Sequence, residues 1–252
     1  MPETNISLFL LAFLPALVYA LMIWFSYPKK TINPKIAFLH FLMGTISVLI
    51  VQTWNWIFPE WSQMYYQIES FPLAMLTKAF VQVALLEEAS KLVTYKFTEM
   101  YRKKIAMPLS TMFYSMCISA GFAVVENMTY ISGYGFETGI RRATTAIVIH
   151  MVLGLMLGYF ISLGTRYKSK WRYRLLGLLF VTSYHALYDF NIFISYVVDP
   201  FGRMFSTGLG INSYWIVSSG LFMVLTMFMH IRWLKYKKLP FTSLWNKLRK
   251  KN

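Results

Sequence analysis

Carboxylate and imidazole side chains occur inside long apolar runs of this 252-residue sequence, where few polar groups are expected. The first of these runs, LLEEASKL, contains Glu87, Glu88 and Lys91. The others contain Glu126 and Asn127 in GFAVVENMTY, His150 in IVIHMVLG, and His185 and Asp189 in YHALYDF. A charged group in the centre of a bilayer costs about 2.5–3.5 kcal/mol on insertion scales, so these runs are candidate functional sites.

Helical spacing indicates which of these side chains lie together. Residues four apart share one face of a helix, which pairs Glu87 with Lys91 and His185 with Asp189. Glu87 and Glu88 are separated by about 100° around the helix, so we expect one to act in chemistry and the other in structure. At a rise of about 1.5 Å per residue, the four runs present their polar groups at overlapping depths in the membrane.

Two kinds of chemistry are open to such a set. A buried carboxylate next to imidazoles can act as a general base on water, and the imidazoles can stabilise the charge that develops during peptide hydrolysis. Alternatively, His150, His185, Glu126 and one glutamate of the EEASK run could ligate zinc with an open position for water. The residues alone leave both routes open, with either no cofactor or one zinc ion.

Other hydrolase patterns are missing from the sequence. It contains no HExxH zinc motif and no G-x-S-x-G serine elbow. The only aspartate besides Asp189 is Asp199, which falls outside the predicted helix at 175–197 that contains Asp189. An aspartyl dyad therefore lacks its second member.

Each polar group also has a purely structural explanation. Glu87 and Lys91 could form a neutralising pair, His185 and Asp189 could clamp two helices, and His150 could serve helix packing. Four separate runs with costly groups at matched depth are harder to explain by packing than any single pair, which favours a site.

The elements that must position these groups are membrane helices. Hydrophobic residues make up 57% of the chain and aromatic residues 18%, whereas only 14% are charged, too few to cover a soluble globule. Apolar runs of about 20 residues match the length of a helix that crosses a bilayer, where only helices satisfy the backbone. We therefore predict an all-α, polytopic membrane helix bundle. About seven transmembrane helices are expected, at residues 5–26, 36–57, 74–97, 109–131, 143–164, 175–197 and 212–233.

The distribution of basic residues predicts the orientation of the bundle. Lys and Arg number 25 against 10 Asp and Glu, and most lie in clusters between alternate runs and in the tail 234–252. The opposite loops hold Arg141, Arg142 and Arg203. The positive-inside rule then places the N-terminus outside and the C-terminus, with its basic tail, in the cytoplasm. Topology thus explains the charge without a nucleic-acid partner, and one integral membrane domain, 1–252, is expected.

The ordered motifs resemble a known family. EEASK at 87–91, GFAVVEN at 121–127, the isolated His150 and HALYD at 185–189 are similar to the EExxK, FxxxEN, lone histidine and HxxxD positions of the PrsW family of intramembrane proteases. The resemblance covers about residues 70–195, the expected protease-like core. More distantly, the chain resembles the CAAX-protease and bacteriocin-processing superfamily, whose second motif has histidine where this chain has glutamate.

The resemblance implies a hydrolase of the bacterial plasma membrane that cuts membrane-anchored proteins, including anti-sigma factors in regulated proteolysis. Glu87 and Glu88 match the paired motif glutamates, one of which is the base, and we favour Glu87 because it shares a face with Lys91. The other matching positions are Glu126, His150, His185 and Asp189, with Asp189 orienting His185 and with Lys91 and Asn127 in supporting roles.

Two other classes of function are compatible with buried carboxylates and histidines. A proton- or ion-coupled transporter uses the same residue types as a relay, and it would move substrate across a bilayer without cleaving peptides. A non-catalytic scaffold with a protease-like fold would keep its function after alanine replaced the polar set. The lipid bilayer is an expected partner in all three cases.

Overall fold

Nearly all described residues lie in helices whose bounds follow the apolar runs. The computed structural model describes residues 5–25, 32–100, 108–198, 204–206 and 212–236. Its helices are α1 (Asn5–Phe25), α2 (Pro34–Ile57), η1 (Pro59–Gln67), α3 (Phe71–Thr77), η2 (Lys78–Ala84), α4 (Leu85–Met100), α5 (Pro108–Tyr134), α6 (Phe136–Thr144), α7 (Ala146–Arg166), α8 (Lys170–Ser195) and α9 (Ser213–Tyr236). Two short antiparallel strands, β1 (Tyr196–Val198) and β2 (Met204–Ser206), pair Val197 with Phe205 and form a hairpin that the all-α prediction did not include.

Local sequence explains where several helices begin and turn. The side chain of Asn33 caps α2 by accepting hydrogen bonds from the backbone N–H groups of Lys35 and Ile36, and Pro34 occupies the first helical position, where no N–H is needed. Gly135 lies between α5 and α6 with a φ of 84°, a conformation that a side chain would strain. This glycine lets α6 turn away from the end of α5.

The third apolar run forms one helical stretch from Phe71 to Met100 with a change of winding inside it. Residues Lys78–Ala84 are a π-helix, and the regular α-helix resumes at Leu85. Such segments are frequent at functional sites. Here the π-helix ends at Ala84, shortly before the EEASK motif begins at Glu87.

Four helical stretches of the described chain are long and apolar enough to cross a membrane: Pro34–Ile57, Pro108–Tyr134, Phe136–Arg166 and Ser213–Arg232. The apolar part of α1, Leu10–Phe25, is shorter. The stretch 71–100 and α8 follow the predicted runs in position, but they carry many of the charged residues. Membrane-crossing length and composition are thus present in four stretches of the described residues, and the seven spans stay a prediction.

Helices α5 and α7 form the buried centre of the bundle, with α2 and α9 at its periphery. Gly154 and Gly158 let the two central helices approach closely. A Cβ atom on Gly154 would lie 2.7 Å from the Cα of Met116, and one on Gly158 would lie 2.5 Å from the Cα of Met112. The spacing of these glycines therefore brings the backbone of α7, which carries His150, against α5, which carries Glu126.

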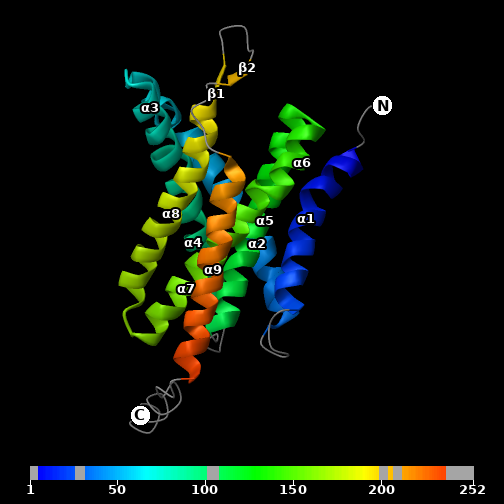
Figure 1. The fold of residues 1–252 in the computed structure, drawn as a ribbon, viewed down its shortest axis with the longest axis vertical. Helices are drawn as coiled ribbons and strands as arrows, with labels where there is room; N and C mark the ends of the chain where they lie inside the picture. The colour runs from blue at the N-terminus through cyan, green and yellow to red at the C-terminus, as the bar shows by residue number, and fades with distance from the viewer. Residues whose placement is uncertain (1–4, 26–31, 101–107, 199–203, 207–211, 237–252) are drawn as a thin grey trace.

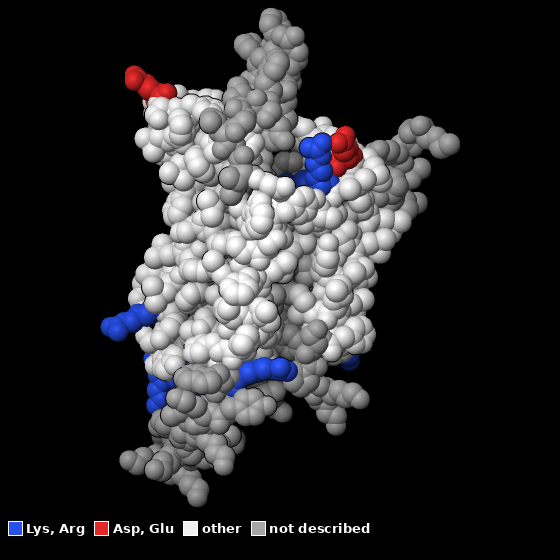
Figure 2. Space-filling view, viewed as in Figure 1, with Lys and Arg blue, Asp and Glu red and all other residues white. Residues whose placement is uncertain are grey.

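The helices run roughly along the long axis, with α1 starting near one end of the molecule and α9 finishing at the other (Figure 1). Charged side chains visible in the space-filling view lie towards the two ends, and the belt between them is largely uncharged (Figure 2). Basic side chains gather at the end where α9 finishes, and acidic ones lie at the opposite end. This distribution is typical of a protein that crosses a bilayer.

Candidate functional site

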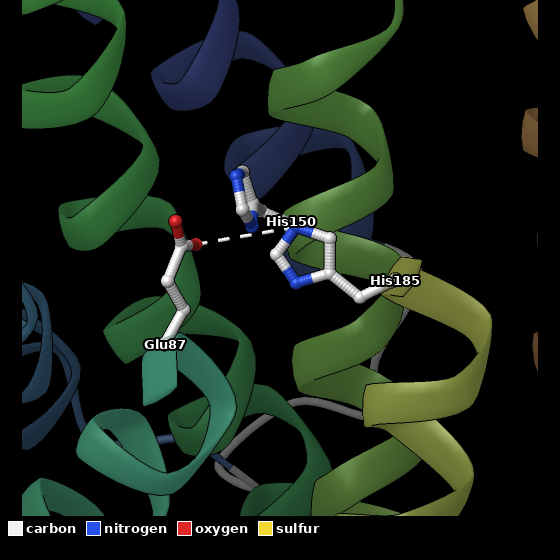
Figure 3. Close-up of side chains that lie close together, drawn as sticks. All are labelled: Glu87, His150 and His185. Atoms are coloured by element: carbon white, nitrogen blue, oxygen red, sulfur yellow. Dashed lines mark ion pairs between the residues drawn. The ribbon is translucent and has the colours of Figure 1, made fainter. Parts of the chain in front are cut away.

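The polar residues of α4, α5, α7 and α8 converge inside the bundle. Glu87 extends from α4 toward His150 of α7 and His185 of α8 (Figure 3). The two imidazole rings have centroids 5.0 Å apart and planes at 89° to each other. Both histidines and Glu87 are buried, so their charges and hydrogen bonds are shielded from bulk solvent.

Glu88 contacts two residues of the cluster through one oxygen, Oε1, while its Oε2 is buried without a hydrogen-bond partner in the described structure. Its side chain is completely buried, and Oε1 lies 2.7 Å from Lys91 Nζ and 2.9 Å from His185 Nδ1. With a proton on Nδ1, His185 donates to Glu88 and presents the lone pair of Nε2 on its other edge. Glu88 therefore neutralises Lys91 and fixes the orientation of His185.

Glu87 reaches the same two partners but is held less tightly. Its Oε2 lies 3.6 Å from Lys91 Nζ and 4.0 Å from His185 Nε2, beyond hydrogen-bond distance in both cases. Within the described part of the chain, this buried oxygen has no hydrogen-bond partner. The two adjacent glutamates thus differ in how closely they contact Lys91 and His185, and their division into a chemical and a structural role stays a prediction.

His150 links the α4 cluster to α5. Its Nε2 lies 2.7 Å from Glu126 Oε2, and its Nδ1 lies 3.0 Å from Lys91 Nζ. A proton on Nε2 satisfies both contacts, because Glu126 then accepts it while the lone pair of Nδ1 accepts from Lys91. Phe122 covers this junction, with its ring centroid 4.1 Å from Lys91 Nζ, which gives the aromatic residue of the FxxxEN motif a cation–π contact.

The remaining motif residues lie at the margins of the cluster. Asp189 follows His185 by one helical turn, and its Oδ2 lies 3.4 Å from His185 Nε2, as the four-residue spacing predicts. Asn127 is completely buried, and its Oδ1 accepts a hydrogen bond from Nε of Arg142 at 3.0 Å. The structure thus brings every predicted site residue, Glu87, Glu88, Lys91, Glu126, Asn127, His150, His185 and Asp189, into one connected group.

Comparison with known proteins identifies the family. A family model for the PrsW family of intramembrane metalloproteases matches residues 33–230, most of the chain. The chain belongs to this family. The match extends the motif-based resemblance in both directions, so that it takes in α2 and most of α9 as well as the four helices that carry the site.

Individual relatives carry the PrsW name and come from bacteria. The Protease PrsW of Clostridioides difficile is 28% identical over 205 residues, which cover 76% of this chain and 82% of that protein. The Protease PrsW of Shouchella clausii is 30% identical over 131 residues, or 49% of this chain and 60% of that protein. That of Bacillus subtilis is 29% identical over 79 residues, covering 31% and 36%. No solved structure matches the chain significantly.

The PrsW family description implies a metal, and the donor set is compatible with one. Glu87, His150 and His185 each offer a ligand atom, and these atoms lie within 4.8 Å of one another. Two imidazole nitrogens and a carboxylate oxygen are a common ligand set for catalytic zinc. Three buried carboxylate oxygens in this group, Glu87 Oε2, Glu88 Oε2 and Asp189 Oδ2, lack hydrogen-bond partners in the described structure, and a bound cation would compensate their charge.

Glu126, which the sequence also offered as a ligand, lies outside this donor group. One of its oxygens contacts His150 Nε2 at 2.7 Å and the other contacts Arg142 Nη2 at 2.9 Å. A carboxylate that holds the second nitrogen of a ligating histidine orients that ligand instead of binding the metal itself. Both oxygens of Glu126 thus serve the network around the site.

Arg142 is the site-linked residue that sequence reasoning missed. It was counted with the loop charges opposite the basic side, yet its side chain is only 14% exposed and contacts both Glu126 and Asn127. Its position three residues after Gly139 in a short polar helix gave no signal of burial. The sequence offered one clue, which is that a buried Glu126 needs a positively charged partner and Arg142 is a candidate.

Proposed function

We propose that this protein is an intramembrane endopeptidase that hydrolyses peptide bonds of membrane-anchored protein substrates. The observation that carries the proposal is the buried cluster of Glu87, Glu88, His150 and His185, assembled from three helices of a membrane-type bundle. Packing alone does not require carboxylates at this depth, where their desolvation is costly. Buried carboxylates and imidazoles are groups that general acid–base hydrolysis uses.

We assign the role of general base to Glu87. Its Oε2 is buried without a hydrogen-bond partner in the described structure, so this oxygen can accept a proton from an attacking water without first breaking a contact. Oε2 of Glu88 also lacks a partner in the described structure, but its Oε1 is already engaged by Lys91 and His185, and we assign Glu88 the structural role. The distances of 3.6 Å and 4.0 Å from Glu87 to the same partners leave room for small adjustments on substrate binding.

The imidazoles hold and move protons around the scissile bond. In the tautomer that Glu88 favours, His185 presents Nε2 between Glu87 and Asp189, where it can receive a proton and return it to the leaving amine. A protonated His185 would also stabilise negative charge on the carbonyl oxygen of the tetrahedral intermediate. Asp189 then orients the ring and balances its charge.

Glu87, His150 and His185 are the residues that would hold zinc. When bound, zinc lowers the pKa of a coordinated water and polarises a carbonyl group. The Lys91 ammonium lies 3.0 Å from His150 Nδ1, so ligation through this nitrogen would require Lys91 to give up its contact. In that case Glu87 serves as a ligand, and in the metal-free case it serves as the base.

The setting that we propose for this reaction is a seven-span protein of the bacterial plasma membrane. The N-terminus would lie outside and the C-terminus in the cytoplasm, in line with the gathering of basic side chains at the end where α9 finishes (Figure 2). We treat 1–252 as one membrane domain with a protease core at about 70–195. Of the basic tail 234–252, residues 237–252 lie outside the described residues. Anti-sigma factors with a single span are the substrate class that we propose.

The test is cleavage of single-span substrates by the purified full-length protein in proteoliposomes. Wild type is compared with Glu87→Gln, Glu88→Gln and His185→Ala, with and without a zinc chelator. We expect wild type to cleave and Glu87→Gln to be inactive. Retained cleavage by Glu87→Gln would refute its role as base or ligand, and cleavage that resists the chelator would argue against zinc. Substrate flux without any cleavage would favour a transporter.

A further inference from the structure

Two neighbouring arginines of α6 have different environments. Arg141 pairs with Glu137 one turn earlier, and their side chains are 69% and 79% exposed. Arg142 points into the bundle, and its side chain and that of Glu126 are 14% and 19% exposed. An exposed pair within one helix contributes little, whereas a mostly buried guanidinium must be matched closely by its partners.

We propose that Arg142 is a positioning residue of the site: it holds Glu126 and Asn127 in place and, through Glu126, keeps the Nε2–H group of His150 hydrogen-bonded, so that Glu126 at Nε2 and Lys91 at Nδ1 together fix the ring. The inference deepens the proposed peptidase function and rests on it for its catalytic meaning. The hydrogen bonds from which it is argued lie on α5, α6 and α7 and can be tested without any substrate.

The guanidinium of Arg142 matches three partners on α5. Nη2 donates to Glu126 Oε1 at 2.9 Å, Nε donates to Asn127 Oδ1 at 3.0 Å, and the Tyr130 ring centroid lies 3.7 Å from the guanidinium carbon. The planar fork of arginine can serve two acceptors and an aromatic face at once, and a lysine ammonium cannot reproduce this geometry. The pairing therefore depends on arginine as well as on positive charge.

Glu126 transmits this positioning to His150. Its Oε1 accepts from Arg142 Nη2, and its Oε2 contacts His150 Nε2 at 2.7 Å. A carboxylate in this position favours the tautomer with the proton on Nε2 and leaves the lone pair on Nδ1, the nitrogen that faces Lys91 at 3.0 Å. Without Arg142, Glu126 would lose the partner that fixes its rotamer and its charge.

Two direct contacts, from Arg142 to Glu126 and from Glu126 to His150, connect α6 to the site. Arg142 lies on α6 directly beyond the turn at Gly135, so α6 folds back along α5 and places the guanidinium opposite Glu126 and Asn127. An arginine that merely fastened α6 to α5 would need one acceptor. Arg142 instead engages the two adjacent polar residues of the FxxxEN motif, and one of these contacts His150 directly.

The test reads the His150 tautomer and the hydrogen bond at its Nε2 by NMR of ¹⁵N-histidine-labelled, metal-free protein in micelles. The sequence has only four histidines, so loss of signals in His150→Gln assigns the ring nitrogens. Wild type and the control Arg141→Gln are expected to show His150 protonated on Nε2. Because Lys91 still faces Nδ1, Arg142→Gln and Glu126→Gln are expected to keep this tautomer but to shift the Nε2 and Nε2–H signals of His150 as the hydrogen bond to residue 126 weakens, and Arg142→Lys to shift them by less.

Cleavage kinetics supply the second readout. Substitutions of groups that orient a site histidine typically cost 10–100-fold, so we expect Arg142→Gln to lower kcat by about that factor with KM little changed. If Arg142 only fastened α6 to α5, Arg142→Gln would lower thermal stability and leave kcat unchanged. Wild-type His150 signals in Arg142→Gln would overturn the proposal, and if that variant does not fold, wild-type signals in Arg142→Lys would do so. If no substrate is cleaved by any variant, the proposed function fails, and the NMR comparison still decides the role of Arg142.

Discussion

Replacing Glu88 by glutamine is expected to destabilise the protein much more than the same replacement of Glu87. Glu88 is completely buried, and its Oε1 lies 2.7 Å from Lys91 Nζ and 2.9 Å from His185 Nδ1. Removing one partner of a buried ion pair leaves the other charge uncompensated and costs about 3–5 kcal/mol. We expect Glu88→Gln to lower the free energy of unfolding by about this amount.

Glu87→Gln should show the opposite balance of effects. The carboxylate lies 3.6 Å from Lys91 Nζ, and its Oε2 makes no hydrogen bond to any described residue, so the loss of stability should be about 1 kcal/mol, typical of point substitutions. Loss of a general base costs about 10²–10⁴-fold in rate, which corresponds to about 3–5 kcal/mol of activation free energy. The variant should therefore be folded and nearly inactive.

Two measurements on the same preparations separate these effects. Unfolding is followed in mixed micelles by tryptophan fluorescence as the fraction of denaturing detergent increases, and kcat/KM is measured with a fluorescent single-span substrate. Glu137→Gln is the matched control, because it removes an exposed carboxylate whose pair with Arg141 contributes about 0.3–0.5 kcal/mol. If Glu88→Gln is as stable as wild type and loses more activity than Glu87→Gln, the assignment of the two roles is wrong.

Three further substitutions test other parts of the structure. Lys91→Met removes the ammonium that neutralises the two glutamates, so zinc should raise its Tm more than that of wild type in a thermal shift assay; equal shifts would contradict the fit of a cation. Gly158→Leu places a Cβ 2.5 Å from the Cα of Met112 and should cost about 1–3 kcal/mol in micelle unfolding, whereas Gly133→Leu, which meets nothing within 4 Å, should stay within about 0.5 kcal/mol of wild type. Asp189→Asn keeps the shape but removes a charge 3.4 Å from His185 Nε2, so kcat should fall about 10–100-fold; an unchanged kcat would limit Asp189 to packing.

Helical spacing was sufficient to predict which motif residues share a face. Pairs such as Glu87 with Lys91 and His185 with Asp189 depend only on the geometry of a single helix, which a sequence specifies directly. The glycines at 154 and 158 indicate that this face of α7 can approach a neighbouring helix closely, whereas the identity of that neighbour, α5, comes from the structure. Predictions of this kind succeed because they concern one helix or one face of it.

Contacts between helices where the chain reverses direction were not predictable in the same way. Arg142 was counted as a loop charge, since nothing in the sequence shows that α6 folds back beyond Gly135 and buries the guanidinium against Glu126. Glu87 and Glu88 also reach shared partners in spite of their angular separation around the helix. A glutamate side chain is long enough to bridge a difference of about 100° when the partners, Lys91 and His185, lie between the two directions.

The charges of the assembled site explain why it can do chemistry. The described cluster contains the carboxylates Glu87, Glu88, Glu126 and Asp189, and the permanent cations that contact them are Lys91 and Arg142. Glu88 and Glu126 take the shortest contacts to these cations, 2.7 Å and 2.9 Å. Glu87 and Asp189 are left on either side of His185 Nε2 with no comparable partner among the described residues. In a low-dielectric interior such a pair requires protons or a divalent cation. The excess of carboxylates over permanent cations makes the cluster costly to bury. For the same reason its carboxylates can take up and release protons, as acid–base chemistry requires.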